Sequence, residues 1–125
     1  ALSNVRYIAN DFPSLDLIKN AKCVAQVTGT AGYEAALLGV PAICFGATWY
    51  SSLYGVFPWK NRETLAHALK FTPDESKLRK SYDKLTRKTY KGLIDRDYKA
   101  LIPNYDEKQA VEQTILSICD MINEY

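Results

Sequence analysis

The sequence is poor in the residues that build metal centres and nucleophilic catalytic sites. It has one histidine, and its three cysteines, Cys23, Cys44 and Cys119, show no metal-ligand spacing. A lone histidine within a helical pattern, such as His67, is more often a surface or packed residue than a general base, so we leave it out of the expected site. Two cysteines fall in expected buried strands and the third on the apolar face of an expected helix, which favours packed thiols in a reducing compartment. We therefore expect no metal and no cofactor.

Other absences narrow the class of protein further. No apolar run approaches the length needed to cross a bilayer, and the first residues lack the charged, apolar and cleavage regions of a signal peptide. The formal net charge of +2 is too small to indicate nucleic acid as a partner. Internal repeats, a Walker pattern, a Ser-His-Asp set and paired carboxylates are also missing from the sequence. With 125 residues, 47% of them hydrophobic, we expect a single cytoplasmic domain over residues 1–125.

The most informative stretch is the one between residues 23 and 46. Strand-forming residues at 23–27 end in a short turn at 28–30, and residues 31–38 then have the composition of a helix. A continuous apolar run at 42–45 follows, which suits a parallel strand covered on both faces. The pattern predicts a strand–helix–strand unit of an α/β fold.

The turn of this unit has the residues of an anion-binding site. Gly29 permits positive φ and close approach of a ligand, and Thr28 and Thr30 add hydroxyl donors. A helix that begins near Thr30 directs free N–H groups and its positive dipole end at the same place, which favours a phosphate, while Glu34 one turn later suits the hydroxyls of a ribose. The alternative is that Thr30 is an N-cap, Gly29 a turn glycine and Glu34 a first-turn acid placed by the dipole.

These residues also carry a resemblance to a known family. The string Thr28-Gly-Thr-Ala-Gly-Tyr-Glu-Ala-Ala-Leu-Leu-Gly-Val-Pro-Ala-Ile-Cys-Phe-Gly46 resembles the nucleotide-binding signature of the bacterial capsule polysaccharide synthesis family, whose characterised members include Kdo transferases of the GT-B fold. The likeness is specific over about residues 4–50 and fades after residue 62. The turn is more loosely similar to that of UDP-sugar epimerases of the same fold. By this resemblance, Thr28, Gly29 and Thr30 would hold the donor phosphate and Glu34 the ribose.

The resemblance implies a fold and a reaction. The fold would be a three-layer Rossmann-like parallel sheet with flanking helices, the carboxy-terminal half of a GT-B protein, with extra helices at its end. The reaction would transfer a sugar from a CMP- or UDP-linked donor, Kdo from CMP-Kdo in the first instance, to a glycolipid or polysaccharide acceptor. The catalytic residues are unknown, because they would lie in a missing amino-terminal domain. The alternatives are a UDP-sugar epimerase and a non-catalytic α/β module that docks a partner.

The remaining elements surround this unit. Residues 4–8 have a strand pattern with no partner upstream, so we expect the chain to be the carboxy-terminal piece of a longer protein. The aromatic-rich stretch 47–60 is expected to be a loop at the same sheet edge as the turn, in which Tyr50 and Ser51 line the donor site and most other aromatics are covered by the missing domain. We expect helices over about 13–19, over 61–70 with Asn61 as N-cap, and from a capping box at 72–75 to about residue 93. A last helix would begin near residue 106.

The expected helix after residue 75 is strongly basic, with only Asp83 against Lys77, Arg79, Lys80, Lys84, Arg87, Lys88 and Lys91. Such a face is most often a solvated helix surface. It would also suit peripheral contact with anionic lipids at the inner face of the plasma membrane, where a lipid-linked acceptor would be found. Both interpretations stay open at the level of the sequence.

Overall fold

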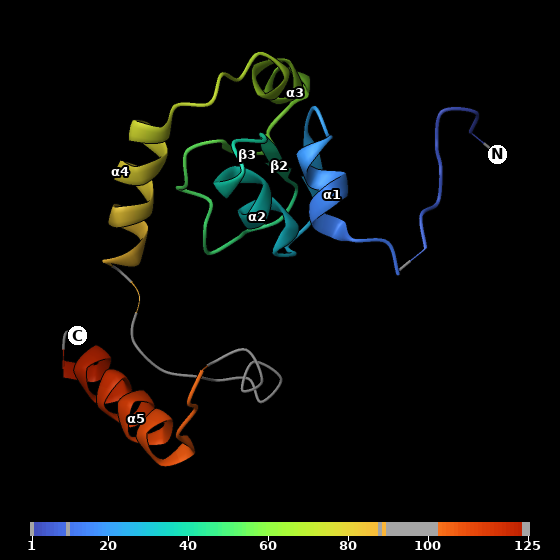
Figure 1. The fold of residues 1–125 in the computed structure, drawn as a ribbon. Coiled ribbons are helices and arrows are strands. Elements are labelled where there is room, and N and C mark those ends of the chain that lie inside the picture. Colours follow the sequence, from blue (N-terminus) through green and yellow to red (C-terminus); the bar gives the residue numbers. More distant parts are fainter. Residues whose placement is uncertain (1, 10, 88, 90–102, 124–125) are drawn as a thin grey trace. The chain divides into compact units, whose positions relative to one another are not determined.

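The computed structural model describes residues 2–9, 11–87, 89 and 103–123. The chain forms two compact units, residues 1–87 and residues 88–125. Among the described residues, the first unit holds the sheet and helices α1 to α4, and the second holds helix α5 (Figure 1).

The core of the first unit is a parallel sheet of three short strands in the order β1-β2-β3. β1 is Val24–Gln26, β2 is Ala42–Cys44 and β3 is Val56–Pro58. The register pairs Val24 with Ala42 and Ala42 with Val56. Every residue of β2 is at most 2% exposed, as the continuous apolar run predicted for a strand covered on both faces. The chain is therefore a mixed α/β protein with a Rossmann-like parallel sheet and flanking helices, which confirms the predicted fold class.

Helix α2, Ala31–Leu37, connects β1 to β2 and completes the predicted strand–helix–strand unit. Ala35 on this helix packs in one core cluster with Ile18 of α1, Ser14–Lys19, and with Val40. Its neighbour Ala36 belongs to a second cluster, with Cys44, Tyr50, Leu53, Val56 and Leu85. The small side chains of α2 thus let the residues of both core clusters pack closely against the helix.

The third strand is not the one that the sequence pattern predicted. Residues 2–9 contain no strand, and their side chains are exposed, with Tyr7 at 87%. The third strand is instead β3, within the stretch that we expected to be a loop. It is bonded to β2 through Ala42 N–H to the Gly55 carbonyl at 2.9 Å and Trp59 N–H to the Cys44 carbonyl at 2.8 Å. Pro58 is compatible with this strand because β3 lies at the edge of the described sheet.

Two helix starts in this unit follow local rules. Asn61 caps α3, Arg62–Leu69, by accepting a hydrogen bond from Glu63 N–H at 3.0 Å, as predicted. α4, Glu75–Thr86, is capped by Asp74, which accepts from Lys77 N–H at 3.0 Å. The predicted cap was Thr72, so the helix begins two residues later than predicted.

The inner face of α3 also differs from the prediction. The apolar pattern predicts an inner side made of Leu65, Ala66, Ala68 and Leu69. Ala68 is buried as predicted, whereas Leu65 and Leu69 are 43% and 55% exposed and Thr64 is buried instead. The Thr64 hydroxyl accepts from Asn61 N–H at 3.5 Å, so its polar atom has a partner within the capping box. A face of small residues therefore packs inward, and the large apolar residues of α3 face solvent.

The second unit contains α5, Glu107–Asn123. The Asp106 carboxylate accepts from Lys108 N–H at 2.9 Å and from Gln109 N–H at 3.1 Å, which confirms the predicted start. The apolar residues at positions 111, 115, 118 and 122, whose spacing puts them on one side of this helix, are exposed. Cys119 is exposed too, so the expectation of a packed thiol is wrong there, while Cys44 is buried and Cys23 partly buried, both as free thiols.

The basic helix meets its prediction only in part. α4 exposes Arg79, Lys80 and Lys84 and ends at Thr86, short of the expected residue 93, while residues 88 and 90–102 lie outside the described residues. Contact of this face with anionic lipid stays a prediction. In the part of the chain that the structure describes, no helix combines the length and apolar composition needed to cross a membrane.

Candidate functional site

The predicted turn lies where β1 ends, at the carboxyl edge of the sheet. Thr28, Gly29 and Thr30 are exposed and Glu34 is half-buried, one turn into α2. Ligands bind at this edge in open parallel α/β sheets, because the helices that follow the strands begin there. The structure therefore presents the four residues of the predicted phosphate and ribose sites to solvent on one short segment.

Thr30 occupies the N-cap position of α2 but does not cap it with its side chain. Its backbone is αR, with φ −83° and ψ −14°, and no side-chain hydrogen bond to the helix backbone is made. Its hydroxyl instead donates to Glu34 Oε1 at 3.4 Å. The interpretation of Thr30 as a side-chain N-cap is therefore not supported, and the first N–H groups of α2 lack a side-chain acceptor from Thr30.

The turn is supported from below by Tyr50 and Gln26. The Tyr50 hydroxyl donates to the Gly29 carbonyl and accepts from Gln26 Nε2, and the same amide nitrogen lies 3.4 Å from Cys44 Sγ. Tyr50 is 0% exposed. Burial raises the pKa of its hydroxyl, so the group keeps its proton and remains a donor at neutral pH. The Gly29 carbonyl is thereby tied to a buried side chain of the core.

This position differs from the one predicted for Tyr50. We expected Tyr50 and Ser51 to line the donor site from a loop. Ser51 is exposed, but Tyr50 lies beneath the turn, where it positions Gly29 and has no surface to offer a ligand. Gln26, which the sequence pattern did not assign to the site, is a second residue beneath the turn. Its signal was a single polar residue within the strand-forming run 23–27, where a side chain with several hydrogen-bonding atoms requires partners.

Gly32 makes room for this network. A Cβ at Gly32 would lie 2.5 Å from Gln26 Nε2 and 3.1 Å from the Tyr50 hydroxyl oxygen. Any side chain there would displace the amide from Tyr50. One further polar atom of this network, Gln26 Oε1, is buried without a hydrogen-bond partner among the described residues. Gln26 and Tyr50 thus form the floor of the turn, a tightly packed pair of polar side chains in an otherwise apolar core.

Aromatic rings adjoin this floor. Tyr33 of α2 contacts Trp49 and Tyr50, with ring centroids 5.0 and 5.8 Å apart, and Trp49 meets Tyr50 edge-on at 5.2 Å. Trp49 is 59% exposed. An exposed tryptophan next to an exposed turn is a surface on which a planar or apolar group of a ligand can pack.

Within the described ranges, no three side chains of the types His, Cys, Asp and Glu gather in a way that would hold a metal ion. The turn itself presents groups that could meet a ligand. It has backbone N–H donors and a helix N-terminus for an anion, and a carboxylate for hydroxyl groups.

Comparison with known proteins places the chain in a family. A search of curated proteins and a search of solved structures found no significant match. The family model described as capsule polysaccharide biosynthesis protein matches residues 1–110, which confirms the predicted resemblance at the level of the family. The chain therefore belongs to the capsule polysaccharide biosynthesis protein family, and this membership supports a role in capsule synthesis.

Proposed function

We propose that this chain is the sugar-nucleotide-binding part of a capsular polysaccharide glycosyltransferase. The observation that carries the proposal is the exposed turn at Thr28, Gly29 and Thr30, whose carbonyl at Gly29 is held inward by Tyr50. The outer side of the turn then offers N–H groups to a phosphate at the start of α2. Membership of a capsule synthesis family supplies the context in which an activated sugar is the expected phosphate-bearing ligand.

The turn and Glu34 bind different parts of the nucleotide, because the turn offers hydrogen-bond donors and Glu34 a negative charge. The backbone N–H groups of the turn and the Thr28 hydroxyl bind the donor phosphate, and the Thr30 hydroxyl orients Glu34 by donating to its carboxylate. A carboxylate in this position would repel a phosphate at contact distance but accepts hydrogen bonds from the paired hydroxyls of a ribose. Glu34 therefore fixes the nucleoside one helical turn away from the phosphate.

In the proposed reaction the sugar is transferred from the nucleotide to a glycolipid or polysaccharide acceptor, with Kdo from CMP-Kdo as the specific case. The nucleotide departs with negative charge on its phosphate, and donors already aimed at that oxygen stabilise the developing charge. A general base or nucleophile would come from another part of the protein. The share of catalysis assigned to this chain is donor binding and stabilisation of the leaving group.

Calorimetric titration of CMP and of UDP into the chain tests the proposal. Glu34→Ala is expected to weaken nucleotide binding by about 1–3 kcal/mol, because hydrogen bonds between the carboxylate and the ribose are lost. Glu63→Ala, a first-turn acid of α3 away from the turn, is the matched control and should bind as the unmodified chain does. Unchanged affinity in Glu34→Ala would remove Glu34 from the site, and no binding of either nucleotide would overturn the proposed function. Conversion of a UDP-sugar without an acceptor by the full-length protein would favour an epimerase instead.

A further inference from the structure

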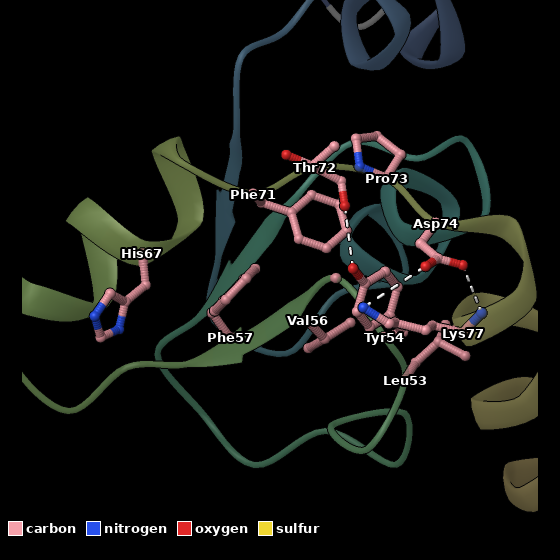
Figure 2. A pocket seen from close by; sticks show the side chains of 11 residues that line it. Leu53, Tyr54, Val56, Phe57, His67, Phe71, Thr72, Pro73, Asp74 and Lys77 are labelled. Atoms are coloured by element: carbon pink, nitrogen blue, oxygen red, sulfur yellow. Dashed lines mark hydrogen bonds and ion pairs between the residues drawn. The ribbon is translucent and has the colours of Figure 1, made fainter.

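A second candidate site lies at the opposite edge of the sheet from the turn. A cavity of about 640 Å³ is formed by the loop that enters β3, the end of α3 and the segment that leads into α4 (Figure 2). Its lining includes Leu53 and Gly55, which precede β3 and so mark the amino edge of the sheet, and none of the residues of the predicted nucleotide site. Its volume is in the range of about 300–1,000 Å³ that small-molecule sites occupy.

The floor of the cavity is a row of three aromatic rings. Phe71 lies between the other two, with its ring centroid 5.0 Å from Tyr54 and 5.7 Å from Phe57 (Figure 2). The Tyr54 hydroxyl donates to the Thr72 carbonyl at 3.1 Å, which fixes that ring. The sequence pattern had assigned Tyr54 and Phe57 to a surface covered by another domain, but they pack against Phe71 within the same unit.

Gly55 allows the central ring to come this close. Its φ is +93°, a region that other residues rarely adopt, and a Cβ built there would lie 3.1 Å from Phe71 Cζ. A side chain at position 55 would therefore both strain the backbone and push the Phe71 ring aside. The aromatic row is fixed by backbone geometry as well as by ring contacts.

Polar groups stand at the two ends of the aromatic row. His67 of α3 lies beyond Phe57 at one end, and Asp74 and Lys77 lie at the other, beyond Tyr54 (Figure 2). Lys77 Nζ is 3.6 Å from Asp74 Oδ2 and 5.7 Å from the centroid of the Tyr54 ring. Because the charges of Asp74 and Lys77 offset one another, the cavity favours a neutral polar ligand over a strongly charged one. The Lys77 side chain is 64% exposed, so its ammonium has donors left for that ligand.

We propose that this cavity binds a short saccharide segment. The C–H face of a sugar ring packs on aromatic rings, and its hydroxyls bond to donors and acceptors at the edge of such a platform. The cavity offers both features together, in a protein of a family whose product is a polysaccharide. The site is separate from the nucleotide turn, so the inference holds whether or not the turn binds a donor.

Aromatic NMR of the 125-residue chain with the neutral trisaccharides maltotriose, triacetylchitotriose and cellotriose as probes tests the inference. At least one of the three is expected to shift the ring resonances of Tyr54, Phe57 and Phe71 in a saturable way. His67 and Lys77 line the cavity and are exposed, so His67→Ala and Lys77→Ala should fold. Each should weaken that binding about tenfold, the equivalent of one lost hydrogen bond. Lys84→Ala, an exposed lysine on α4 outside the cavity, is the matched control and should change nothing.

Two results would overturn the inference: no ring shift with any of the three probes, or affinities that neither cavity variant changes. CMP titration reports on the backbone amides of residues 28–30, whereas the saccharide titration reports on the aromatic row. Failure of one site is thus distinguishable from failure of the other.

Discussion

Replacement of Tyr50 by phenylalanine removes one hydroxyl group and keeps the ring that packs against Tyr33 and Trp49. That hydroxyl donates to the Gly29 carbonyl and accepts from Gln26 Nε2, so the substitution removes both hydrogen bonds at once. Gln26 Nε2 keeps only its contact with Cys44 Sγ at 3.4 Å. The turn at the candidate site would lose its attachment to the core.

The expected loss of stability in Tyr50→Phe follows from the burial of the Tyr50 side chain. Tyr50 is 0% exposed, so water cannot easily replace the lost hydroxyl beside the Gln26 amide. The Gln26 amide keeps only a weak sulfur acceptor, so its loss approaches the roughly 1–3 kcal/mol that a buried donor without a partner costs. Gly29 is exposed, and its carbonyl can turn to solvent at little cost. We therefore expect Tyr50→Phe to lower the free energy of unfolding by about 1–3 kcal/mol with little change in denaturant dependence.

Urea unfolding followed by tryptophan fluorescence measures this change, since Trp49 contacts Tyr50 directly. Tyr7→Phe is the matched control, because Tyr7 is 87% exposed and its change should stay within about 0.5 kcal/mol. In a double-mutant cycle with Gln26→Met, the two substitutions should be coupled by about 0.5–3 kcal/mol, as contacting residues are. A loss in Tyr50→Phe no larger than that of the control, or strict additivity in the cycle, would refute the role assigned to the hydroxyl.

Two further substitutions have expected outcomes. Gly32→Ala should destabilise the protein even though alanine favours a helix by about 1 kcal/mol over glycine, because its Cβ would lie 2.5 Å from Gln26 Nε2; equal or higher stability in thermal unfolding would contradict this. The hydrogen bond from Lys77 N–H, and then the Lys77 charge, lower the pKa of Asp74 below its ordinary value of 3.8. The Asp74 carboxylate therefore stabilises α4 fully above pH 3.8, and this stabilisation is lost as the pH falls through the lower pKa of the folded state. Asp74→Asn, which keeps an N-cap but does not titrate, should remove this acid dependence in unfolding measured from pH 7 to pH 2, and an unchanged pH profile would show that the Asp74 carboxylate is not its source.

The sequence by itself determined the features that depend on neighbouring residues. The strand, turn and helix at residues 23–37 follow from local composition and from the stop at Gly39 and Pro41. The caps at Asn61 and Asp106 involve hydrogen bonds to residues two or three positions away, so they too can be found without the fold. The same holds for the exposed turn of the candidate site, because its residues are consecutive.

The tertiary structure determined the features that depend on contacts between residues far apart in the sequence. Residues 4–8 and β3 both have strand composition, but only β3 lies where β2 can pair with it, because a strand is stable only with a neighbour. Tyr50 reaches Gly29 and Gln26 across more than 20 residues of sequence, and no local pattern distinguishes that position from a place in a surface loop. The aromatic row of the second cavity likewise joins β3 to the end of α3. Non-local packing, rather than composition, therefore set the floor of the candidate site.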